Sequence, residues 1–122
     1  MTIKEFAEIV FYELFPDLRG KTYYSFIDKD KDEAIGIYER RSNSRECYGK
    51  SSYKEKNLVI LVHWTRSSTS CEEKAQEIAE KLDRYEFDKG WVKVDTPPID
   101  VGKDEREIFE RTIDITIINK EE

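Results

Sequence analysis

The chain has 122 residues, 38% of them hydrophobic and 39% charged, with a formal net charge of −6 at pH 7. This length predicts one domain over residues 1–122, and the 12% aromatic content argues against intrinsic disorder. The acidic balance disfavours a general nucleic-acid-binding role. No apolar run approaches the roughly 20 residues that a membrane-spanning helix needs, and two cysteines provide no disulfide framework. We therefore expect a protein without membrane contact, made in a reducing cytoplasm.

The first segment is predicted to form a helix that ends before Pro16, because the residue before a proline leaves the helical region. Thr2 and Glu5 have the spacing of a capping box at its start. Apolar side chains recur at helical spacing through it, at Ile3, Phe6, Ala7, Val10 and Leu14.

Two strands are predicted next, over residues 21–27 and 34–40, joined by the polar turn 28–32 into a hairpin. The acidic residues of this stretch also match four ligand positions of a calcium-binding loop: Asp28, Asp30, Asp32 and Glu39. That loop requires glycine at its sixth position, where this chain has Glu33, so a charged turn is the favoured interpretation.

Residues 40–56 have the composition of a long loop with six basic and two acidic residues. A loop of this length in a small domain is usually functional or disordered. The alternative is a solvated excursion without a role.

Residues 58–64 form a continuous apolar run, which is typical of a strand buried on both faces. A helix should follow, because Cys71, Ala75, Ile78 and Leu82 lie on one helical face. Ser70 and Glu73 have capping-box spacing and predict that this helix begins at Ser70.

The C-terminal part predicts a short strand over residues 91–94, a polar loop over 99–106 and a last strand over 109–119. The element order is therefore α-β-β-β-α-β-β. Short connections favour antiparallel neighbours. The predicted fold class is α+β, with two helices on one face of a mostly antiparallel sheet of about five strands.

Two residues are candidates for chemistry. Cys71 lies at a helix start, where the dipole lowers a thiol pKa, but it also lies on the apolar stripe and is expected to be buried. His63 is the only histidine, and on a central strand it is more often a hydrogen-bonded structural residue than a base. One His and two distant Cys lack the fourth ligand of a zinc site.

The C-terminal part resembles a known family. The run from Pro97 to Glu105 (PPIDVGKDE), followed by a closing strand over 109–118, is similar to the end of tailed-bacteriophage minor capsid proteins of the tail-terminator and head–tail joining group. The predicted element order resembles that fold across nearly the whole chain. The resemblance implies a hexameric ring that stops growth of the tail tube and joins it to the head connector, with no catalysis and no cofactor.

On that basis, the expected partners are other copies of the chain, the tail tube protein and the connector protein. Nucleic acid is not directly required, and the protein would pass from the host cytoplasm into the virion. Interaction residues are expected in the two polar loops: Arg40, Arg41, Arg45, Tyr48, Lys50, Tyr53, Lys54, Asp100, Asp104 and Arg106.

Two alternatives remain open from the residues. One is a small cytoplasmic enzyme or nucleic-acid-processing domain that uses Cys71 or clustered carboxylates. The other is an adaptor whose basic loop grips nucleic acid, with Tyr48 and Tyr53 stacking on bases.

Overall fold

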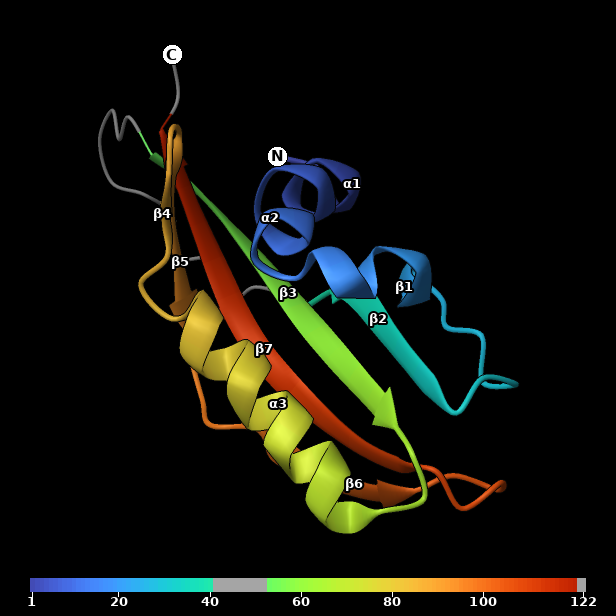
Figure 1. Ribbon diagram of the computed structural model, residues 1–122. Helices are drawn as coiled ribbons and strands as arrows, with labels where there is room; N and C mark the ends of the chain where they lie inside the picture. Colours follow the sequence, from blue (N-terminus) through green and yellow to red (C-terminus); the bar gives the residue numbers. More distant parts are fainter. Residues whose placement is uncertain (41–52, 121–122) are drawn as a thin grey trace.

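The computed structural model describes residues 1–40 and 53–120 and shows an α+β fold (Figure 1). Its sheet has seven strands in the order β1-β2-β3-β7-β5-β4, and β6 also pairs with β7. The strands are β1 (Thr22–Tyr24), β2 (Glu33–Glu39), β3 (Tyr53–Trp64), β4 (Glu86–Phe87), β5 (Gly90–Val94), β6 (Ile99–Lys103) and β7 (Phe109–Lys120). The predicted fold class is confirmed in outline, but the sheet has more strands than expected and is mixed.

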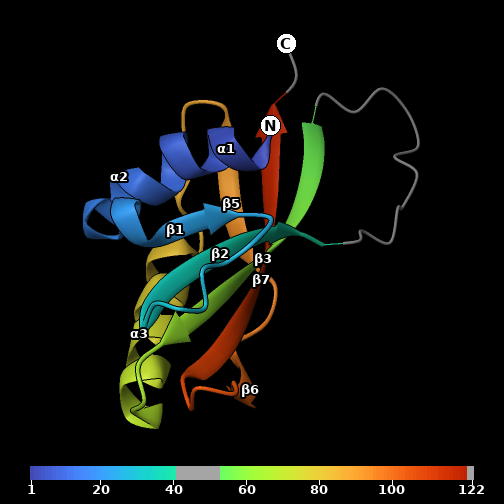
Figure 2. The ribbon, with the colours of Figure 1, turned by 90° about the vertical axis from the view of Figure 1, so that its right-hand side faces the viewer.

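All described helices lie on the same face of the sheet, as Figure 2 shows from the side. They are α1 (Ile3–Phe6), the π-helical turn Ala7–Phe11, α2 (Tyr12–Leu14), the 3₁₀ helix Pro16–Lys21 and α3 (Ser68–Leu82). The opposite face of the sheet carries no helix among the described residues. We call this second side the uncovered face.

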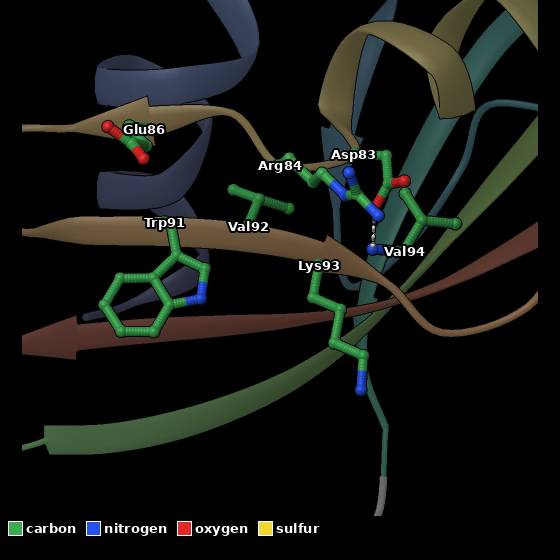
Figure 3. A pocket seen from close by; sticks show the side chains of 7 residues that line it. All are labelled: Asp83, Arg84, Glu86, Trp91, Val92, Lys93 and Val94. Carbon is green, nitrogen blue, oxygen red and sulfur yellow. Dashed lines mark hydrogen bonds between the residues drawn. The ribbon is translucent and has the colours of Figure 1, made fainter.

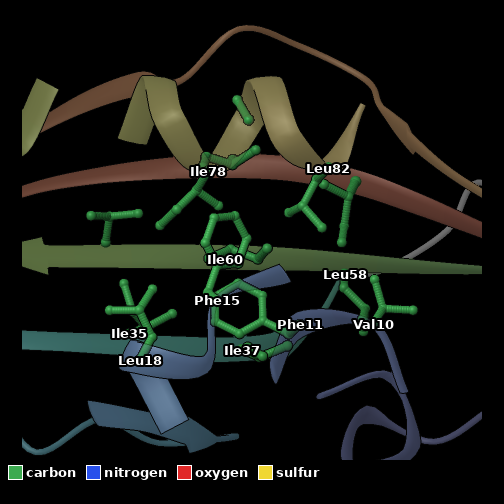
Figure 4. Close-up of a cluster of buried hydrophobic side chains, with 14 of the residues drawn as sticks. Val10, Phe11, Phe15, Leu18, Ile35, Ile37, Leu58, Ile60, Ile78 and Leu82 are labelled. Atoms are coloured by element: carbon green, nitrogen blue, oxygen red, sulfur yellow. The ribbon is translucent and has the colours of Figure 1, made fainter. Parts of the chain in front are cut away.

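The core lies between the helices and the long central strands β3 and β7. Alternate residues of each strand point toward the helices, so that Ile60 and its register partner Ile113 are both fully buried. The aromatic rings of Phe11 and Phe15, with centroids 5.0 Å apart, fill the space between the N-terminal helix and the sheet (Figure 4). The isoleucine alternation in β7 follows the sequence pattern. The expected burial of β3 on both faces is wrong, because Val59 and Leu61 on the uncovered face are only partly buried.

The N-terminal helix is confirmed with its capping box. Glu5 N–H donates to Thr2 Oγ1 at 3.1 Å, and the Glu5 side chain accepts from Thr2 N–H. The helix ends at Leu14, before Pro16, as the proline predicted. The 3₁₀ helix that follows was not predicted.

The predicted hairpin is wrong, because β1 pairs with β2 in parallel. After Tyr24 the chain turns at Ser25, which has φ of 62°, and runs back through residues 25–32 before β2 starts. A parallel pair normally needs a long crossover. Here eight residues suffice, since a three-residue strand spans only about 10 Å.

Strand β3 starts at Tyr53, so the predicted loop over residues 40–56 is wrong for its last four residues. Three consecutive charged residues, Lys54, Glu55 and Lys56, hide the strand in the sequence because they show no apolar alternation. Residues 53–56 form part of the strand because β3 pairs with β7 from Tyr53, opposite Lys120, to His63, opposite Glu110.

Helix α3 begins earlier than predicted. Ser67 is its N-cap, and Ser67 Oγ accepts from Ser70 N–H at 3.2 Å. The prediction of a start at Ser70 is wrong because a serine run offers several caps with similar spacing.

Strand β6 occupies Ile99–Lys103, where the sequence predicted a loop. A bulge between Asp100 and Gly102, with Gly102 at φ of 97°, interrupts the alternation that would have marked it. β6 forms because β7 extends beyond its pairing with β5 and offers its first residues to another strand. The short strand β4 was also missed.

Trp64 links the two helical regions across the end of β3. Its ring makes cation–π contacts with two ammonium groups, with Lys21 Nζ 5.3 Å and Lys74 Nζ 5.1 Å from the ring centroid. Lys21 belongs to the 3₁₀ helix and Lys74 to α3, so one side chain fastens both to the sheet.

In the ranges 1–40 and 53–120, no helix combines the length and apolarity needed to cross a bilayer.

Candidate interaction surfaces

Arg40, predicted to interact with a partner, is tied into the uncovered face at the end of β2. Its Nη2 contacts Asp95 Oδ2 at 2.5 Å and donates to the Ile115 carbonyl at 3.2 Å and to Asn57 Oδ1 at 3.3 Å. Thr116 Oγ1 lies within hydrogen-bond distance of both Asp95 and Asn57, at 2.7 and 2.8 Å. The network fixes where the basic segment leaves the sheet.

The other predicted residues of this segment divide into two groups. Tyr53 and Lys54 are the first residues of β3, so they belong to the sheet. Four of the predicted residues lie outside the part of the chain that the structure describes: Arg41, Arg45, Tyr48 and Lys50.

The second predicted loop places its residues at the opposite end of the sheet. Asp100 lies in β6, where its Oδ1 accepts from Gly102 N–H at 2.9 Å and its Oδ2 is 3.7 Å from Arg111 Nη2. Arg106 reaches the 25–32 segment, donating to the Lys29 carbonyl at 2.6 Å and to Asp32 Oδ1 at 3.2 Å.

Asp104 lies beside the buried His63. Burial raises the Asp104 pKa, but hydrogen bonds from the N–H groups of Ile108 and Arg106 and the neighbouring His63 and Lys29 lower it more. The net result is an Asp104 pKa below its ordinary value. The loop from Asp104 to Ile108 is therefore held by an ionised carboxylate.

His63 is fully buried and hydrogen-bonded at both ring nitrogens, as expected for a structural histidine. Nε2 lies 3.0 Å from the Lys31 carbonyl oxygen, which can only accept, so Nε2 carries a proton. Nδ1 lies 3.1 Å from Glu110 Oε2 and 3.7 Å from Asp104 Oδ2. Lys29 Nζ is 3.5 Å from the same Glu110 oxygen. We call His63, Glu110, Asp104, Lys29 and Arg106 the histidine cluster; it ties the loop 104–108 and the segment 25–32 to the sheet.

Among the described residues, no group of three or more His, Cys, Asp or Glu is placed to hold a metal ion. In particular, the acidic turn and Glu39 stand at opposite ends of β2, so they cannot converge on one calcium ion.

Cys71 is buried on the apolar face of α3, with Sγ 3.4 Å from the Phe109 carbonyl. Burial raises the pKa of this thiol to about 11. A thiol with this pKa is protonated at neutral pH, which argues against Cys71 as the nucleophile in the enzymatic alternative.

A depression of about 690 Å³ lies where α3 leads into β4 and β5 (Figure 3). Its lining mixes both charges with apolar side chains: Asp83, Arg84, Glu86, Trp91, Val92, Lys93 and Val94. Asp83 Oδ1 accepts from Val94 N–H at 3.1 Å and closes one side. The balanced charge of this depression gives no selectivity for one sign of ligand.

Sequence reasoning missed the exposed apolar side chains of the uncovered face. Trp91 and Ile99, 38% and 48% exposed, lie on this face by their register with Ile118 and Thr112. Phe26, 59% exposed, packs on Tyr23 with ring centroids 5.1 Å apart. The sequence did contain one signal for this exposed apolar surface: Ile99 and Val101 are two positions apart, which is the spacing of residues on one face of a strand. Exposed apolar side chains that gather on one face of a sheet are typical of an interaction surface.

The comparison with protein families identifies the family of this chain. A model described as "Bacteriophage tail terminator protein" matches residues 12–120, which span all seven strands and α3. The chain belongs to the bacteriophage tail terminator family. No curated protein matches the chain.

Membership of the tail terminator family confirms the resemblance noted in the C-terminal sequence. The family is one of structural tail proteins, so this terminator is a component of a phage tail. The match includes both predicted interaction loops and the whole uncovered face.

Proposed function

We propose that this protein forms a ring at the end of the phage tail tube, stops growth of the tube and joins the tail to the head. The observation that carries the proposal is the tail terminator family match over residues 12–120. The one-sided sheet agrees with it, since Trp91, Ile99 and Phe26 expose apolar surface that an isolated domain would normally cover.

The ring would be a hexamer of identical copies that binds the tail tube protein on one side and the head connector on the other. Neither catalysis nor a cofactor is needed for this role. To cap a polymer, a protein needs only one surface that binds the last ring of the tube and an opposite surface to which no further tube subunit binds.

The basic segment 40–56 is the proposed contact with the tube. It combines six basic and two acidic residues in a chain with net charge −6, so it is suited to an acidic partner surface. The Arg40 network anchors one end of this segment and β3 the other. Asp100, Asp104 and Arg106 belong to a second proposed contact at the far end of the sheet.

The test uses tail tubes polymerised from the tube protein of the same phage. With the terminator present, electron microscopy should show one ring at tube ends, tube elongation should stop, and the protein should sediment with the tubes. Replacing residues 41–52 by a Gly–Ser linker of equal length should abolish co-sedimentation. The matched control inserts the same linker at Lys89, in the β4–β5 turn. Tubes that grow on unchanged with no bound terminator would overturn the proposal.

A further inference from the structure

Two edge strands of the sheet, β1 and β6, carry exposed apolar side chains at or next to matching positions, while β4 ends the main strand order on the β6 side. β1 forms one edge and pairs only with β2 among the described strands, whereas β6 pairs only with β7. Each therefore leaves one side of its backbone without a strand partner in this part of the chain. Natural edge strands are normally blunted by charge or by cover. Here Ile99 of β6 is 48% exposed, and Phe26, just beyond β1, is 59% exposed.

The two edges are opposite ends of the same residue row. The register runs from Ile99 in β6 to Thr112, then Leu61, then Gly36, and ends at Tyr23 in β1. Directly paired residues point to the same side of a sheet. Ile99 and Tyr23 therefore both point to the uncovered face, at the same height and on opposite edges.

The strand directions also fit. Four strand pairs connect β1 to β6. The β1–β2 pair is parallel, and the β2–β3, β3–β7 and β7–β6 pairs are antiparallel, so β6 runs antiparallel to β1 within one copy. A neighbouring copy placed beside the first in the same orientation would bring its β1 alongside β6 as an antiparallel pair. That geometry gives well-aligned backbone hydrogen bonds.

The charges flanking the two edges are opposite. Residues 99–107, around β6, contain four acidic and two basic residues. Residues 19–24, at and just before β1, contain two basic and no acidic residues. Lys29 and Lys31 do not add to this edge, because their segment crosses to Glu110 of β7 and His63 of β3. Two β6 edges would repel each other, as would two β1 edges, whereas β6 against β1 combines opposite excess charges.

From these observations we propose that copies of this chain join head to tail, with β6 of one copy pairing antiparallel with β1 of the next. The sheet then continues from copy to copy, and Ile99 packs beside Tyr23 and Phe26 of its neighbour. A contact between two different surfaces of the same chain closes into a ring when the rotation between copies permits. This inference rests on the proposed ring and names the two surfaces that build it.

The first experiment is disulfide formation between single-cysteine variants in a Cys47→Ser background, where the remaining Cys71 is buried. Ile99→Cys mixed with Tyr23→Cys should give a covalent dimer under mild oxidation, while either variant alone should give none. Ile9→Cys is the matched control, because Ile9 is 42% exposed but lies on the helical side. Mixed with Tyr23→Cys, it should give no dimer. Cross-linking of Ile99→Cys with itself would overturn the proposal in favour of a two-fold contact.

The second experiment is sedimentation velocity of Ile99→Asp and Ile9→Asp beside the wild type. Ile99→Asp should weaken association by roughly tenfold or more, as loss of a central apolar contact does, and Ile9→Asp should leave it unchanged. If the wild type and Ile99→Asp associate equally, the edge contact is wrong while the ring proposal stands. If the wild type neither associates nor caps tubes, the proposed function itself fails, and the edge contact fails with it.

Discussion

The histidine cluster should be the most sensitive polar site in this fold, because a fully buried ring holds two separate loops. His63→Ala removes the hydrogen bond to Glu110 at 3.1 Å and the one to the Lys31 carbonyl at 3.0 Å. A hydrogen bond to a charged group contributes about 1.5–3 kcal/mol and a neutral one about 0.5–1.5 kcal/mol. With the small cavity left by the ring, the free energy of unfolding should fall by about 3–4 kcal/mol.

A double-mutant cycle isolates the contact between the two residues. Glu110→Ala alone leaves Nδ1 of the buried imidazole without its partner at 3.1 Å and should cost about 2–3 kcal/mol. The double variant should be less destabilised than the sum of the single variants by about 1.5–3 kcal/mol, because the second deletion removes an interaction already lost.

Urea denaturation at neutral pH measures all four proteins, and Lys103→Ala serves as the control. Lys103 pairs with Glu107 at 3.5 Å, but both side chains are more than half exposed, so its loss should cost less than about 0.5 kcal/mol. A His63→Ala cost below about 1 kcal/mol, or single effects that add within about 0.5 kcal/mol, would refute the reasoning.

Two further outcomes follow from packing and burial. Gly90→Ala should lower the free energy of unfolding by about 3 kcal/mol or more, since the added Cβ would lie 1.9 Å from the Ile118 carbonyl oxygen. Gly20→Ala is the control and should change stability little, because nothing lies within 4 Å of its added Cβ. Thermal denaturation compares the two variants. In a Cys47→Ser variant, native Cys71 should resist a thiol reagent at pH 8 and react once unfolded, and rapid native labelling would contradict its burial. Because its pKa is raised from 9.0 to about 11, the unfolded thiol ionises first and stability should fall as pH rises above about 9.

The sequence predicted correctly those elements whose residue patterns are local and regular. The capping box at Thr2 and Glu5, the isoleucine alternation of β7 and the apolar run from Leu58 all appear where predicted. The parallel β1–β2 pair could not be predicted. Its direction depends on the turn at Ser25 and on contacts such as the Tyr12–Tyr24 hydroxyl pair at 3.0 Å, and neither has a sequence signature.

For the proposed interaction residues Asp104 and Arg106, the sequence predicted their place in a loop but not the side chains around them. Asp104 and Arg106 were chosen as loop residues, and the structure adds that they hold internal contacts with His63 and Asp32. Ile99 was assigned to a polar loop because the bulge in β6 broke the alternation, so its exposure on a sheet edge was not predicted. Edge exposure is a property of strand order, which becomes visible only after long-range pairing.

The position of β7 at the centre of the sheet has a consequence for synthesis. It is the last of the described strands in chain order, yet β3, β5 and β6 all pair with it. Until β7 has been synthesised, β3 lacks one neighbour and β6 has none among the described strands, so the nascent chain cannot complete this sheet. Such long-range pairing is slow and leaves apolar strands transiently exposed. A chain that stops before β7 therefore lacks the strand on which β6 forms, and it cannot present the β6 edge.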